Sequence, residues 1–140
     1  MRTMRALASV FALCALLSTP GWSSAHEVKV TLNPQNNSGE SGTVTLTETN
    51  DDKKTKVEVM VKGQPTGVAQ PMHIHKGTCA ELATMPMAKA AYGLPALKGG
   101  KAKAVIDVPL DTLQAEHYAI NGRKSAQSTV SAFCGDIPSE

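Results

Sequence analysis

The stretch Lys56–Lys62 has the sequence KVEVMVK, in which every second residue is valine. Side chains two positions apart on an extended strand lie on the same face, so this alternation predicts a strand with one buried face. Val28–Leu32 and Thr43–Thr47 alternate in the same way and are rich in the β-branched residues that strands favour. Turn-forming residues fill segments 33–42 and 50–54 between these stretches. Residues 28–62 are therefore predicted to form mostly β-structure.

Four more strands are predicted further along the chain. They are Met72–His75, Lys101–Val108, His117–Asn121 and Thr129–Cys134. The long connection Gly77–Gly100 includes a helix-compatible stretch, residues 80–91, which Pro86 and Pro95 would keep short. Seven to eight short strands in about 115 residues favour an all-β fold, an antiparallel β-sandwich.

The first 25 residues have the composition of a removable leader. Residues 1–5 are basic at two positions, residues 6–17 are apolar, and residues 23–25 are small. This order is typical of a secretory signal peptide, so residues 1–25 are expected to be removed and residues 26–140 to form one periplasmic or secreted domain. The apolar run is shorter than the roughly 20 residues that a spanning helix needs. No membrane span is expected in the mature protein.

The charge balance argues against a nucleic-acid partner. The whole chain has 14 Lys and Arg residues and 12 Asp and Glu residues. Removal of the leader takes away Arg2 and Arg5, which lowers the basic count from 14 to 12 and leaves the mature domain neutral. Proteins that bind nucleic acids present a basic face. We therefore expect no nucleic-acid partner.

Two cysteines remain in the mature chain, Cys79 and Cys134. In an oxidising compartment an even pair of cysteines is expected to form a disulfide. The alternative is a metal site in which both thiolates are ligands.

His73 and His75 are the strongest candidate metal ligands. On a strand both would project from one face, with Cα atoms roughly 6.6 Å apart, while Met72 and Ile74 would face the core. Two imidazoles at that spacing can converge on one ion, and imidazole suits copper and zinc. The alternative is a solvated or hydrogen-bonded pair without metal.

Three further side chains are candidate helpers. His26 would be the new N-terminus, where the free amine and the imidazole together can chelate Cu(II); an inert, exposed terminus is the alternative. Met85 and Met87 lie in the long connection, and thioethers select Cu(I), although a methionine pair also serves as loop packing.

Two segments together resemble the Cu/Zn superoxide dismutase superfamily and its small exported bacterial relatives, often grouped with chordin-type (CHRD) domains. Gly67–His75 (GVAQPMHIH) is similar to the family's glycine-led strand, which ends in two copper-binding histidines. Phe133–Ile137 (FCGDI) is similar to the family's C-terminal Cys-Gly-x-Ile. The resemblance implies a Greek-key β-sandwich over residues 28–137, copper at His73 and His75, and a disulfide between the two cysteines.

The sequence departs from the family at its other functional positions. Ile120–Ser125 (INGRKS) matches a segment in which small exported relatives carry a further copper-binding histidine, and here Arg123 takes that place. A guanidinium cannot ligate a metal, because it has no free lone pair to donate. Residues 77–100, where the family places zinc ligands, contain neither His nor Asp, so no zinc is expected.

These features favour an exported copper-binding or copper-handling protein that is not an efficient dismutase. Copper is the expected cofactor, at His73 and His75, with Arg123 beside the site. Two alternatives stay open: a metal-free structural or interaction module, and a copper-only superoxide dismutase. The sequence identifies no protein partner.

Overall fold

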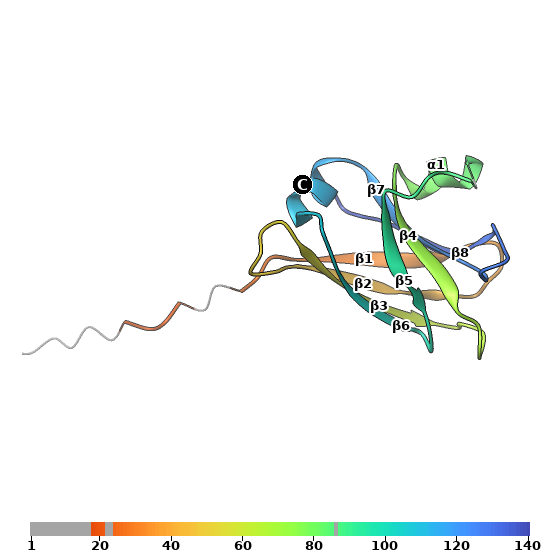
Figure 1. Cartoon of the computed structure of the whole chain (residues 1–140), viewed down its shortest axis with the longest axis horizontal. Coiled ribbons are helices and arrows are strands. Elements are labelled where there is room, and N and C mark those ends of the chain that lie inside the picture. Colours follow the sequence, from red (N-terminus) through yellow and green to blue (C-terminus); the bar gives the residue numbers. More distant parts are fainter. Residues whose placement is uncertain (1–17, 22–23, 86) are drawn as a thin grey trace, which may run out of the picture.

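The computed structural model describes residues 18–21, 24–85 and 87–140. These residues form eight strands and two short helices (Figure 1). The strands are β1 (Glu27–Pro34), β2 (Ser41–Glu48), β3 (Thr55–Lys62), β4 (Gln70–Lys76), β5 (Tyr92–Leu97), β6 (Lys101–Ile106), β7 (Tyr118–Arg123) and β8 (Ser131–Asp136). The helices are α1 (Cys79–Thr84) and α2 (Leu110–Ala115).

All strand pairs are antiparallel, and the strands follow the order β5-β4-β7-β8-β1-β2-β3-β6. One layer contains most of β1 with β2, β3 and β6, and the other contains β4, β5, β7 and β8. Figure 1 shows β4 and β5 crossing over the strands of the first layer. The end of β1 pairs with β8 through Asn33 and Pro34 and thereby joins the layers.

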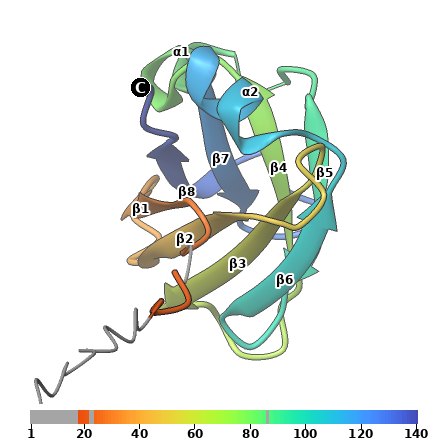
Figure 2. The same cartoon turned by 90° about the vertical axis from the view of Figure 1, so that its left-hand side faces the viewer.

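The two ends of the strand order also meet. A turn at Gly99 and Gly100 connects β5 to β6, and Lys98 pairs with Lys101 across it. β7 then returns to lie beside β4, which is a Greek-key connection. The result is a closed, barrel-like sandwich (Figure 2), so the all-β prediction is confirmed.

The core lies between the layers and is built from the alternating residues. The inward positions of the first three strands are all buried, and they are Val28, Val30, Leu32, Val44, Leu46, Val57, Val59 and Val61. From the other layer, Met72 and Ile74 of β4 and Phe133 of β8 pack against them. The predicted orientation of Met72 and Ile74 is therefore confirmed.

Two elements were not predicted from the sequence. β5 contains Gly93 and Pro95, which strands disfavour, but it pairs only with β4. Proline is tolerated on such a strand, because the missing N–H can lie on the side that has no ladder partner. α2 is a short helix, and its Leu110 and Leu113 are buried in the core.

α1 covers the outer face of the second layer. It packs on β7 and β8 (Figure 1), where Leu82 joins Ala119 and Cys134 in a small apolar cluster outside the main core. Thr78 caps the helix by accepting from the Glu81 N–H, and the Glu81 carboxylate accepts from the Thr78 N–H at 2.7 Å. The predicted short helix in the long connection is thus confirmed.

A disulfide joins Cys79 at the start of α1 to Cys134 in β8, with Cα atoms 5.9 Å apart. The predicted pairing is confirmed, and the thiolate metal site is wrong because both sulfurs are used in the bond. The disulfide fixes α1 and the following loop against the sheet.

The expected signal peptide, residues 1–25, lies outside the described residues except at positions 18–21 and 24–25. Among the residues that the structure describes, no helix has the length and apolar character needed to cross a membrane.

Candidate functional site

His73 and His75 lie next to each other on the outer face of β4. Their ring centroids are 5.8 Å apart and the rings are tilted by 65°. The two-residue spacing predicts this arrangement, because Met72 and Ile74 occupy the alternate positions that face the core. The two imidazoles are therefore placed where they could share one ion.

The protein favours the neutral form of His73. Burial lowers the pKa of His73 below its ordinary value of 6.5, and the positive charges of Arg123 and then His75 lower it further. The ring atom Nδ1 of His73 is buried and has no hydrogen-bond partner among the described residues. A neutral imidazole with an unpaired ring nitrogen is the state that ligates a metal.

His75 is buried and its ring is oriented by the backbone. Its Nδ1 lies 3.3 Å from the carbonyl oxygen of Lys89, in the loop that follows α1. A carbonyl can only accept, so Nδ1 carries the hydrogen in this contact. Metal-binding histidines are commonly oriented in this way by a carbonyl on their second nitrogen.

Arg123 lies on β7, the strand that pairs with β4. The register places Asn121 opposite His73, and Arg123 follows two positions later. A register shift between Gly122 and Arg123 in the pairing with β8 marks a bulge, a feature that redirects side chains. The sequence-based expectation that Arg123 lies close to the histidine pair agrees with its effect on the pKa of His73.

Within the described residues, the guanidinium of Arg123 has no carboxylate partner. None of the ion pairs or side-chain hydrogen bonds between described residues includes it. The Glu81 carboxylate completes the cap of α1, where it accepts from the Thr78 N–H.

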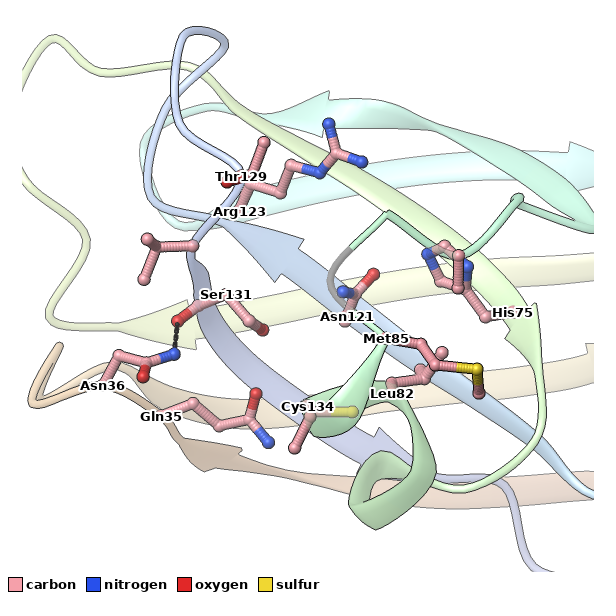
Figure 3. A pocket seen from close by; sticks show the side chains of 13 residues that line it. Gln35, Asn36, His75, Leu82, Met85, Asn121, Arg123, Thr129, Ser131 and Cys134 are labelled. Atoms are coloured by element: carbon pink, nitrogen blue, oxygen red, sulfur yellow. Dashed lines mark hydrogen bonds between the residues drawn. The ribbon is translucent and has the colours of Figure 1, made fainter.

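A cavity of about 530 Å³ opens beside His75, between β7, β8 and the α1 segment. Figure 3 shows Arg123 and Thr129 at one end of it and His75, Met85 and Leu82 at another. The described residues that line it are Gln35, Asn36, His75, Leu82, Ala83, Met85, Ala88, Asn121, Arg123, Thr129, Val130, Ser131 and Cys134. Its wall is thus polar around Arg123 and apolar along α1.

The structure brings only one of the three candidate helpers to this cavity. Met85 lines it, whereas Met87 is 72% exposed and is not part of its wall. His26 contacts the Gln114 side chain at 3.1 Å and the Glu140 carboxylate at 3.4 Å, and none of these three residues lines the cavity. His26 and Met87 therefore do not assemble with the histidine pair.

No group of three or more His, Cys, Asp or Glu side chains suited to hold a metal occurs in the described part of the chain. Of the candidate donors, His75 and the Met85 thioether line the cavity, and His73 lies beside His75 on β4; methionine is outside those residue types. An ion held by these three side chains would keep room for an external ligand.

Sequence reasoning missed several residues that shape this cavity. Asn121, Leu82 and Ser131 come from three different elements, and their proximity depends on the pairing of β7 with β4 and β8 and on the position of α1. One local signal was available, since Asn121 is two positions before Arg123 and shares its face.

No family model, no curated protein and no solved structure matches this chain. The resemblance to the superoxide dismutase superfamily therefore rests on the sequence segments alone.

Proposed function

We propose that the protein is an exported copper-binding protein in which His73 and His75 hold the ion at the edge of the cavity, with Met85 as a third ligand. The observation that carries this proposal is the histidine pair itself. Two rings lie 5.8 Å apart, and one of them has a buried ring nitrogen without a partner in the described residues. Unsatisfied buried nitrogens are rare and often mark a missing ion or water.

The chemistry of the donors favours copper. Imidazole suits copper, and a thioether selects the Cu(I) state. A neutral His73 needs no deprotonation before it binds, so its lowered pKa favours metal binding near neutral pH. The resemblance to the superoxide dismutase superfamily supports the same assignment, as a proposal about this chain.

The proposed task is binding or transfer of copper and not dismutation. Arg123 stands where the resemblance would require a histidine. The positive charge of its guanidinium opposes the binding of a metal cation nearby. Modest affinity and an open coordination position suit a protein that passes its ion on.

The test is a titration of the purified protein with Cu(I) and Cu(II) under conditions that control free metal. We expect one ion per chain, and His73→Ala and His75→Ala should each weaken binding by at least about tenfold, which corresponds to the loss of one ligand. His117→Ala is the matched control, because His117 is an exposed histidine outside the cavity wall.

Two further variants separate the helpers. Met85→Leu should weaken Cu(I) binding more than Cu(II) binding, whereas Met87→Leu should change neither, since only Met85 lines the cavity. Arg123→His should raise copper affinity, because it removes a like charge and adds a ligand. Equal binding by wild type and the His73/His75 double variant would mean that the domain acts without metal at this site.

A further inference from the structure

We propose that the cavity beside β7 binds a small amphipathic carboxylate, whose carboxylate group pairs with the Arg123 guanidinium and whose apolar body lies against α1. This assignment does not depend on copper, and it concerns the metal-free protein. It rests on the charge, the hydrogen bonding and the two-sided wall of the cavity.

Several basic side chains form ion pairs, and the guanidinium of Arg123 does not do so within the described residues. In the described residues, six basic side chains lie within 4.0 Å of a carboxylate, and Arg123 is not one of them. The six are His26, Lys29, Lys54, Lys56, Lys76 and Lys103. Arg123 is half-buried and lines the cavity, and its guanidinium makes no hydrogen bond within the same residues. Its five N–H donors are therefore available to a ligand.

The remainder of the wall admits an anion. Among the described residues that line the cavity, Arg123 is the only Lys or Arg, and none is Asp or Glu. An anion at Arg123 would meet one positive charge and no negative one.

The ligand should be a carboxylate and not a phosphate. One guanidinium matches one carboxylate through two parallel hydrogen bonds. A phosphate dianion carries more charge than a single arginine can balance, and Lys124, the next basic residue in sequence, directs its Nζ to the Asn36 carbonyl at 2.7 Å. The polar side chains near Arg123 are uncharged amides and hydroxyls.

The side of the cavity formed by α1 and the following loop is apolar, so it suits the apolar part of a ligand. Leu82 is buried, and with Ala83, Met85 and Ala88 it forms an apolar part of the wall. Figure 3 shows Leu82 and Met85 at the end of the cavity away from Arg123. A volume of about 530 Å³ lies within the range of roughly 300–1,000 Å³ that small-molecule sites occupy. Such a volume is far larger than a lone inorganic anion requires.

The experiment uses the chain expressed from its full sequence, purified, and freed of metal on a chelating resin. Calorimetric titration with octanoate should show one site. Acetate, which lacks the apolar body, and octanol, which lacks the charge, should each bind more weakly by at least about tenfold. Equal binding of octanol and octanoate, or no octanoate binding, would overturn the proposal.

Charge-altering variants locate the site. Arg123→Gln should weaken octanoate binding about 10- to 100-fold, the range for a hydrogen bond to a charged group, and Arg123→Lys should restore part of it. Lys103→Gln is the matched control, since Lys103 lies on β6 and pairs with Glu58 at 3.4 Å. A thermal melt of each variant confirms that it is folded.

Two outcomes separate this inference from the copper proposal. Octanoate binding that survives in His73→Ala but fails in Arg123→Gln supports the carboxylate site, whatever copper does. Octanoate binding that is unchanged in Arg123→Gln overturns it, as does inorganic phosphate binding more tightly than octanoate.

Discussion

His73 shows how one neighbouring charge adjusts a candidate ligand. Its nitrogen is buried, its ring lies beside His75, and the Arg123 guanidinium acts on it from the adjacent strand. Burial is the largest cause of its lowered pKa, and Arg123 is the second. The same arginine thus keeps His73 ready to ligate and makes the site less favourable for a cation.

Arg123→Gln should raise the pKa of His73 without restoring it to 6.5, because burial persists in the variant. NMR titration of the His73 ring measures this directly. A pKa that stays unchanged would contradict the placement of Arg123 next to His73.

The lowered pKa of His73 also makes the stability of the folded protein depend on pH. The unfolded chain binds a proton at His73 near pH 6.5, whereas the folded chain binds it only at lower pH. The contribution of His73 to stability is therefore present above that value and is lost as the pH falls below it.

Gly122 is required by its contact with the core. A Cβ at this position would overlap the ring of Phe133, which is fully buried. Gly122→Ala should lower the free energy of unfolding by about 1–3 kcal/mol, the usual cost of overpacking. Urea unfolding measures this change. Gly93→Ala on β5 is the control, because nothing lies within 4 Å of its Cβ position, and an equal loss there would contradict the steric explanation.

At the scale of elements, α1 is short and depends on its cap. Six residues form few helical hydrogen bonds, so the reciprocal contacts of Thr78 and Glu81 hold a large share of its first turn. α1 also supplies the apolar wall of the cavity through Leu82. Fraying of this helix would therefore open the cavity.

Thr78→Ala should cost about 1 kcal/mol of stability, whereas Thr78→Ser should cost little, because serine keeps the capping oxygen. Chemical denaturation checks the energy, and hydrogen exchange at the α1 amides checks the location. Exchange that rises equally across the sheet would show that the cap acts on the whole domain and not on α1.

For the whole molecule, the disulfide is the main covalent restraint. It closes a loop of 55 residues between Cys79 and Cys134 and fixes the cavity wall against β8. Replacement of both cysteines by alanine should lower the free energy of unfolding by about 4 kcal/mol, on the chain-entropy account of such loops. Unfolding of the variant beside the reduced wild type measures this, and a loss below 1 kcal/mol would be too small for that account.

Much of the strand content was predictable from particular residues. Val57, Val59 and Val61 alternate with polar positions, and this alternation follows from the covalent geometry of an extended chain. The orientation of His73 and His75 was predictable for the same reason. β5 was missed because Gly93 and Pro95 hide an edge strand, whose stability comes from its pairing with β4.

The sequence by itself determined what depends on local spacing: the β-strands, the common face of His73 and His75, and the presence of one cysteine pair in residues 26–140. Only the tertiary structure decided which distant segments meet. The cavity exists because β7 pairs with β4 and β8 while α1 is fixed against them by the disulfide, and this pairing brings Arg123 toward His73. Such placement depends on strand register and packing between residues far apart in the chain, which local periodicity does not encode.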